Sequence, residues 1–424
     1  MFSLLRRSLP SAGRVLFRGV IPPPLASIRW PSAATVRELD PTDDLAWRAE
    51  VDHPDWGRAE ACAFRHGALA LPFIEFTTAL TAAEKAEALL GHATIGVRTS
   101  ASAGSVLRDR KRLLRWLRLL LDAEGAVAID DGSLLPWSRA MLDDELAHDA
   151  PLDVEALYTL HAVAGDGGRV AWLHTHGLSE IGAFDFDILE PSERFMLGCA
   201  DPCRSLACAA LEGLARPGDT RYELAHPGGE VRLLPVAEFV ARASTRHRAL
   251  RAEDEAHGGS RVVVCEPAGW LSSWRDTPRP SRFLSTTDSD RVVFRFSDNA
   301  TAVGAERAQL TVPVLRTLAA EFSDLRLPIL LKLGYETDQG SREHLWFECH
   351  ELQDDHADAT LVNSPFDIAA MNEGDRGIHP YERLSDWQIL SPVGSMSPRN
   401  VSAARLIRER RAEIAALTRG SQPE

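Results

Sequence analysis

The order of hydrophobic and polar positions predicts helices and strands that alternate along most of the chain. Residues 77–91 contain a capping box, because Thr81 is followed three residues later by Glu84, and this pattern predicts a helix. The β-branched run 92–100 predicts a strand, and the amphipathic run 105–125 predicts a long helix with a short buried strand after it. This order predicts a sheet with a helix packed on one face.

Two apolar segments joined by a glycine-bounded turn predict an antiparallel hairpin in the middle of the chain. Its strands are residues 172–176 and 183–189. A helix is predicted before the hairpin, at 151–163, because Pro151 falls in its first turn. Further elements follow the hairpin: a helical pattern at 192–215, a strand at 229–236 and a helix at 237–253.

The composition changes between residues 250 and 290, where polar stretches with Pro and Gly surround a single predicted strand. Beyond residue 325, short strands at close spacing predict a small curled sheet or a barrel, followed by a C-terminal helix. We therefore predict an α+β protein in four segments: a basic, disordered tail (1–35), an α+β domain with helices on a sheet (36–249), a linker with one strand (250–290), and a small β-rich domain with a C-terminal helix (291–424).

The N-terminal segment has the composition of a transit peptide. Residues 1–35 contain five arginines, and no acidic residue occurs before Glu38. Three hypotheses explain this: an organellar presequence, a disordered basic tail, or a start codon assigned too far upstream. We favour the disordered tail, because no apolar periodicity is apparent there.

Bulk composition limits the class of protein. Hydrophobic residues make up 45% of the 424 residues and charged residues 25%, which is typical of a globular domain. The net charge of -14 argues against nucleic acid as the main partner. No apolar run approaches the roughly 20 residues of a transmembrane helix. The 6 scattered cysteines form no CxxC pair, which favours free thiols in the cytoplasm.

Two parts of the chain resemble known families. Residues 310–395 resemble the bacterial domain of unknown function 2314, whose recognisable elements are a Glu-His-x-Trp strand, an Asn-x-Pro turn, a Gly-Asp turn and a terminal Asp-Trp. In this chain these are Glu343, His344, Trp346, Asn363, Pro365, Gly374, Asp375, Asp386 and Trp387. Residues 40–245, with their HTHGL segment, are similar to the domain of unknown function 4026. The resemblance implies a bacterial, cytoplasmic protein of two modules and no catalytic activity.

The segment 172–190, WLHTHGLSEIGAFDFDILE, is the first candidate site. His174 and His176 are two residues apart in a strand, so they point to one face. With Asp187 they could bind a divalent metal such as zinc. With Glu180, Asp185 and Asp187 they could form a metal-free binding site. We favour a third interpretation, a structural hairpin with hydrogen-bonded imidazoles, because this sequence lacks part of the ligand set that known HxH enzymes use.

The second candidate site lies on a C-terminal strand. His344, Trp346, Glu348 and His350 point to one face, and Leu345, Phe347 and Cys349 to the other. An aromatic side chain between charged ones suits a binding surface, and Asp386 and Trp387 would extend it. A solvated sheet face with cross-strand pairs explains the pattern equally well.

Known catalytic signatures are missing from the sequence. It contains no P-loop, no GxSxG elbow, no HExxH and no zinc-finger spacing. We therefore predict a non-enzymatic cytoplasmic bacterial protein that binds another protein, as accessory or immunity-type proteins do, and that needs no cofactor. The alternative is a metal-dependent hydrolase that uses His174 and His176 with Asp185 or Asp187. The sequence leaves the oligomeric state open.

Overall fold

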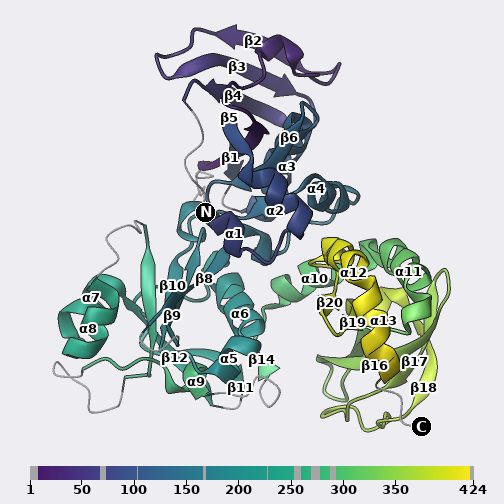
Figure 1. Ribbon diagram of the computed structural model, residues 1–424. Coiled ribbons are helices and arrows are strands. Elements are labelled where there is room, and N and C mark those ends of the chain that lie inside the picture. The colour runs from purple at the N-terminus through teal and green to yellow at the C-terminus, as the bar shows by residue number, and fades with distance from the viewer. Residues whose placement is uncertain are drawn as a thin grey trace, which may run out of the picture.

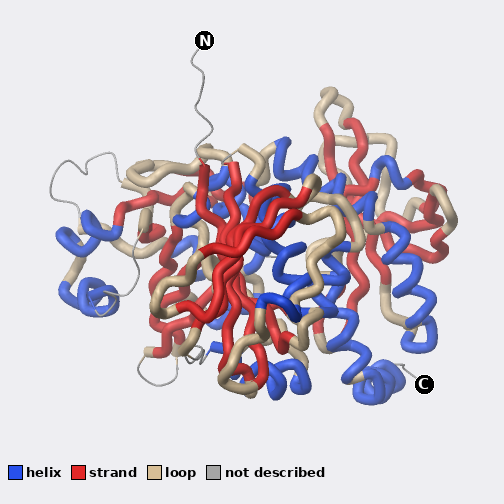
Figure 2. Tube along the Cα trace, turned by 90° about the horizontal axis from the view of Figure 1, so that it is seen from above, coloured by secondary structure: helices blue, strands red, loops and turns tan. Residues whose placement is uncertain are grey.

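Three β-sheets organise the protein, and helices pack beside each of them (Figure 1). The computed structural model describes residues 8–66, 73–102, 104–165, 169–226, 228–252, 259–268, 277–286 and 293–420. In the perpendicular view, the strands of the first sheet twist strongly as they cross the middle of the molecule (Figure 2). The predicted α+β class is confirmed.

The first sheet has seven strands in the order β2-β3-β4-β5-β1-β6-β7. The strands are β1 (Ser8–Arg18), β2 (Thr35–Leu39), β3 (Leu45–His53), β4 (Gly57–Phe64), β5 (Gly91–Ser102), β6 (Gly125–Asp130) and β7 (Pro136–Trp137). The predicted helices are present, since Thr81 and Glu84 form the expected capping box. The helices of this part are α1 (Phe73–Phe76), α2 (Ala82–Leu89), α3 (Val106–Leu121) and α4 (Arg139–Leu146).

The prediction of a disordered tail is wrong for residues 8–18. They form β1, which lies between β5 and β6 and pairs with both in antiparallel register. Alternate side chains such as Leu9, Val15 and Phe17 are buried. Gly13 faces α3, because a Cβ there would lie 2.9 Å from a Leu117 methyl group. The arginines occupy the more exposed positions, so the transit-peptide composition hid an alternating strand. Residues 1–7 lie outside the described residues.

The second sheet has the order β14-β11-β12-β13-β10-β9-β8, and only the β10–β13 pair is parallel. Its strands are β8 (Thr159–Ala164), β9 (Val170–His176), β10 (Asp185–Leu189), β11 (Tyr222–His226), β12 (Gly229–Pro235), β13 (Arg261–Cys265) and β14 (Val293–Phe294). The helices beside it are α5 (Glu193–Leu197), α6 (Ala200–Leu211), α7 (Val236–Arg242), α8 (Thr245–Ala252) and α9 (Arg282–Thr286). The predicted hairpin is confirmed as β9–β10.

Two other predictions for this region are corrected by the structure. The helix predicted at 151–163 is a single 3-10 turn, η2 (Val154–Leu157), followed by β8, because Asp153 caps the turn and Tyr158 is already extended. The strand predicted inside the linker is β13, which lies between β10 and β12 at the centre of the sheet. Its five residues are all buried, as expected for a central strand.

The third sheet is antiparallel, with the order β18-β17-β16-β15-β19-β20. Its strands are β15 (Ile329–Glu336), β16 (Arg342–Leu352), β17 (His356–Leu361), β18 (Arg376–Pro380), β19 (Leu384–Ser391) and β20 (Gly394–Met396). One face packs against α10 (Asp298–Leu310), α11 (Val312–Glu321), α12 (Ala404–Glu409) and α13 (Arg411–Gly420), and these form a separate hydrophobic core. In the part of the chain that is described, no helix is long and apolar enough to cross a membrane.

Candidate functional site

The two histidines of the HTH segment lie on one face of β9, beside a third histidine from β8. The His161 ring centroid is 5.2 Å from that of His174 and 5.9 Å from that of His176. Trp172 stacks on His174 at 4.5 Å. The Arg251 guanidinium of α8 lies over the Trp172 ring, with its Cζ atom 4.8 Å from the ring centroid. The segment is therefore an aromatic and cationic cluster packed beneath α8.

Asp185 has a structural role that uses both carboxylate oxygens. One oxygen accepts hydrogen bonds from the Thr175 hydroxyl (2.9 Å) and the Leu178 amide (3.1 Å). The other accepts from the amide and hydroxyl of Ser179, at 3.1 and 2.7 Å. The carboxylate thereby fixes the turn that leads into η4 (Ser179–Ile181). Glu180 lies in η4 and is exposed.

Asp187 is fully buried and is bound by two guanidinium groups, Arg251 at 2.6 Å and Arg261 at 2.8 Å. A carboxylate bound in this way is neutralised by cations and is a poor partner for a metal ion. Within the described ranges, no group of three or more His, Cys, Asp or Glu side chains is placed to hold a metal. The alternative metal set His174, His176 and Asp187 stays a prediction, and in this structure Asp187 pairs with the two arginines.

The polar face predicted for the C-terminal strand is largely present on β16. Leu345 and Phe347 are buried, while Trp346 and Glu348 face outward. Lys332 of β15 lies over the Trp346 ring, with its Nζ atom 5.4 Å from the centroid. Burial lowers the pKa of Lys332, and Asp386 acts in the opposite direction. His344 contacts the Ser385 hydroxyl at 2.8 Å.

Trp387 was predicted to extend this polar face, and this prediction is wrong. Its register partner on β15 is Leu331, so Trp387 points into the core and is fully buried. Its indole Nε1–H donates to the Thr311 hydroxyl at 2.9 Å. Adjacent strand residues point to opposite faces, so Asp386 alone can extend the surface. Asp386 instead pairs with Arg399 at 2.8 Å.

A loop between β17 and β18, residues 362–375, was missed as a candidate site. The Glu343 carboxylate accepts hydrogen bonds from the Phe366 amide (2.9 Å) and the Asp367 amide (3.1 Å). The Asn363 side chain accepts from the Trp346 amide at 2.7 Å, and Ile368 is buried beneath the loop. Phe366 is nevertheless 86% exposed. The sequence signal was the Pro-Phe pair in a turn, directly after the Asn-x-Pro motif.

The third sheet is joined to the rest of the protein by buried ion pairs. Arg307 of α10 donates from both terminal nitrogens to Glu145 of α4, from Nη1 to the Pro151 carbonyl (3.0 Å) and from Nε to the Pro398 carbonyl (2.7 Å). The Nζ atom of Lys111 lies 3.4 Å from Glu145. These residues are nearly inaccessible to solvent, so the contact is a structural joint rather than a surface pairing.

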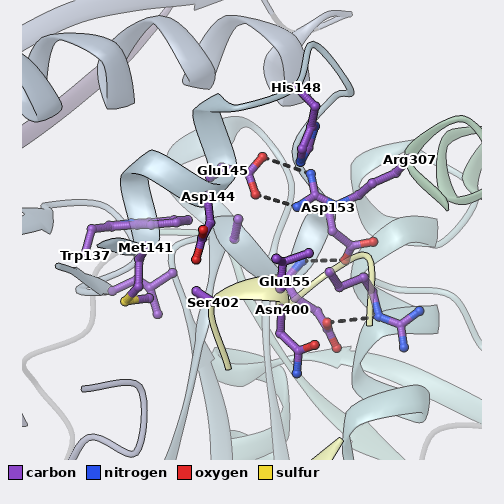
Figure 3. Close-up of a pocket in the computed structure, with 14 residues that line it drawn as sticks. Trp137, Met141, Asp144, Glu145, His148, Asp153, Glu155, Arg307, Asn400 and Ser402 are labelled. Carbon is purple, nitrogen blue, oxygen red and sulfur yellow. Dashed lines mark hydrogen bonds and ion pairs between the residues drawn. The ribbon is translucent and has the colours of Figure 1, made fainter. Parts of the chain in front are cut away.

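A cavity of about 200 Å³ lies beside this joint (Figure 3). Burial lowers the pKa of His148 to about 4, with Lys111 adding to the effect. Burial raises the pKa of Glu155 to about 7, with Asp153 adding to the effect. Burial alone would raise the pKa of Asp153, but Arg204 outweighs it and holds that pKa well below its usual range. The lining residues are Leu135, Trp137, Met141, Asp144, Glu145, His148, Asp153, Glu155, Ala156, Arg307, Arg399, Asn400, Val401 and Ser402.

Comparison with known proteins identifies one segment of the chain. No curated protein and no solved structure matches. The resemblance of residues 40–245 to the domain of unknown function 4026 stays a prediction. Residues 319–396, which include the third sheet and the loop that carries Phe366, match the family described as an uncharacterised protein conserved in bacteria (DUF2314). The predicted similarity of the C-terminal part to that family is confirmed.

Proposed function

We propose that the protein is a non-enzymatic accessory protein that binds another protein through the loop 362–375. The observation that carries this proposal is the exposure of Phe366 on a loop whose backbone is held by Glu343. An aromatic side chain offers a large apolar contact area. A loop that is already ordered loses little conformational entropy when it binds, so more of the contact energy remains as affinity.

Charges around the loop define the chemistry of the partner. Asp338 accepts a hydrogen bond from the Ala369 amide, and Glu373 accepts one from the Ser364 hydroxyl. Asp338 and Glu373 therefore contact the loop that carries Phe366, Asp367 is the next residue in that loop, and all three are exposed. The partner that fits is therefore a protein with an apolar pocket rimmed by Lys and Arg. Opposite charges at the rim would speed association and reduce binding of other proteins.

Three of the residues that carry the family resemblance make structural contacts, which supports a structural rather than a catalytic role for them. Glu343 and Asn363 fix the loop, and Trp387 fixes α10 against the sheet through Thr311. None of these three contacts needs a substrate or cofactor. A cytoplasmic location belongs to the same proposal and is supported by scattered cysteines that form no disulfide within the described chain.

The test compares two exposed phenylalanines. A partner captured from a bacterial lysate is identified, purified and titrated against wild type, Phe366→Ala and Phe76→Ala by calorimetry. Phe76 is 79% exposed on α1, far in sequence from the loop, and is the matched control. We expect Phe366→Ala to weaken binding about 30-fold, the effect of losing an aromatic anchor worth about 2 kcal/mol, and Phe76→Ala to have no effect.

A second variant, Glu343→Gln, tests whether the ordered loop matters. It keeps Phe366 but weakens the acceptor of two amides, so dissociation should become faster while the melting temperature changes little. Raising salt from 0.05 to roughly 0.5 M should weaken wild-type binding, because exposed charges are screened. A partner that binds Phe366→Ala as tightly as wild type, or no partner at all, would contradict the proposal.

A further inference from the structure

The third sheet has an open edge along β18. This strand pairs with β17 on one side, and no strand of the described chain pairs with its other side. β18 lies at the outer border of the sheet (Figure 1). The opposite border is closed, because the Asn400 side chain donates to the Ser395 carbonyl of β20 at 3.0 Å and η8 (Val401–Ala403) packs beside that strand.

The hydrogen-bond register determines which backbone groups of β18 point outward. The Leu361 amide of β17 donates to the carbonyl of the residue that precedes β18. Every second residue of β17 bonds to β18, so the backbone of Ala359 bonds to its register partner Gly377. The N–H and C=O groups of Arg376 and Ile378 therefore point away from the sheet. Within the described chain, these outward groups bond to no other backbone group.

An exposed apolar residue stands at the centre of this open edge. Ile378 is 62% exposed, and its register partner on β17 is Asp358. The Arg376 guanidinium binds the same Asp358 carboxylate at 2.9 Å, so its charge is compensated. Proteins usually protect an open edge with charged side chains, with proline or with a covering segment, because such an edge pairs with other chains. β18 has a proline only at its last position, so its middle can receive another strand.

Carboxylates at both ends of β18 define the charge of a strand that can add there. Glu373 and Asp375 precede β18, and Asp355 lies beside its far end, where the Asp355 carbonyl accepts from the Tyr381 amide at 3.2 Å. All three acidic residues are exposed. A second copy of this chain would bring the same carboxylates against them and would be repelled. A basic segment meets charges of the opposite sign.

We propose that a basic, extended segment of the bound protein adds to β18 as a further strand of the third sheet. The N–H and C=O groups of this segment bond to those of Arg376 and Ile378, and one of its apolar side chains covers Ile378. This strand addition rests on the proposed function, because the loop 362–375 that carries Phe366 leads directly into β18. It specifies how the partner binds and which charge the partner carries.

Short peptides test the open edge in the absence of a partner protein. The peptide Lys-Val-Lys-Val-Lys-Val, with blocked ends, is added to the full-length protein at low salt, and amide hydrogen exchange is measured. We expect the amides of Arg376 and Ile378 to exchange about tenfold more slowly with the peptide bound, and the Gly377 amide to be unchanged, because it is already bonded within the sheet. A Glu-Val peptide of the same length should not protect them, because its charge is repelled. A Lys-Val peptide N-methylated at every residue should not protect them either, because it has no N–H donors.

Variants of Ile378 test the edge from the side of the protein. Ile378→Pro removes the outward N–H group and leaves the bonds to β17 intact, and proline is tolerated at such edge positions. It should weaken binding of the Lys-Val peptide about tenfold, the effect of one lost hydrogen bond. Ile378→Lys keeps the N–H group but places a cation against the basic peptide, so it should weaken binding as well. Ile21→Pro is the matched control and should bind like wild type, because Ile21 is 81% exposed and lies outside the strands.

Phe366→Ala distinguishes the strand addition from the proposed role of the loop. This variant should bind the Lys-Val peptide like wild type, because the peptide has no pocket for the phenyl ring. Unchanged exchange of the Arg376 and Ile378 amides, equal binding of the N-methylated or the Glu-Val peptide, or wild-type binding by Ile378→Pro would each overturn the strand addition alone. A partner protein that binds Phe366→Ala as tightly as wild type, while the Lys-Val peptide still protects β18, would overturn the role of the loop alone.

Discussion

The joint at Arg307 gives the sharpest test of how the C-terminal sheet is held. Arg307→Met keeps an unbranched apolar stem at this position but removes the guanidinium group. Glu145 then stays buried without its main partner, and the carbonyls of Pro151 and Pro398 lose their donor. Removing one partner of a buried ion pair costs about 3–5 kcal/mol. Lys111 stays 3.4 Å from Glu145 and offsets part of this, so we expect a loss of about 3 kcal/mol.

Urea unfolding followed by circular dichroism measures the loss. The control is Arg108→Met, because Arg108 and Glu306 also join α3 to α10 but are 56% and 39% exposed. Exposed pairs contribute about 0–1 kcal/mol, so the control should lose less than about 1 kcal/mol.

A double variant, Arg307→Met with Glu145→Gln, separates the energy of the ion pair from any nonspecific destabilisation caused by the single substitutions. It should lose less than the sum of the two single variants, since the buried charge disappears together with its partner. A loss below about 1 kcal/mol in Arg307→Met, or strict additivity in the double variant, would refute the view that this buried pair holds the joint.

Two further predictions concern single carboxylates. Asp185→Asn should lower the free energy of unfolding by about 2–3 kcal/mol. The amide NH2 group would replace one carboxylate oxygen and would face two donors that now have an acceptor. An unchanged melting temperature would contradict this prediction. Glu155 has its pKa raised from 4.5 to about 7, so the unfolded chain gives up its proton first and stability is lost as pH rises from 4.5 to 7. Glu155→Gln removes this loss. Because about 35% of the side chain is exposed, we expect the variant to be about 1–2 kcal/mol more stable than wild type at pH 8 and equally stable at pH 4. If urea unfolding gives the same difference in stability at both pH values, the prediction is wrong.

Local sequence patterns predicted many of the helices and strands, but they contain no information on contacts between residues far apart in the chain. The capping box at Thr81 and the β9–β10 hairpin are encoded within a few residues, so they were predicted correctly. The arginines near the N-terminus give the composition of a transit peptide, and this conceals β1, in which they occupy the outer positions of a period of two. Asp386 and Trp387 are adjacent in β19, so alternation allows only one of them on the polar face, and Trp387 lies on the other.

The candidate site depended on contacts that no local pattern contains. Arg307 and Glu145 are 162 residues apart, and each looks like a solvated helix position in the sequence. Glu343 reads as one polar residue on a strand, and its role appears only when the loop at 362–375 folds back onto it. The same holds for the cavity, whose wall combines α4, η2, α10 and the segment after β20.

The central position of β1 also sets the order in which the first sheet can fold. Its partners are residues 91–102 and 125–130, so about 130 residues must leave the ribosome before both edges of this strand are paired. During that interval an apolar strand is open to chaperones and to other nascent chains. Arg14 and Arg18, alternating with its apolar side chains, then act as gatekeepers against premature association.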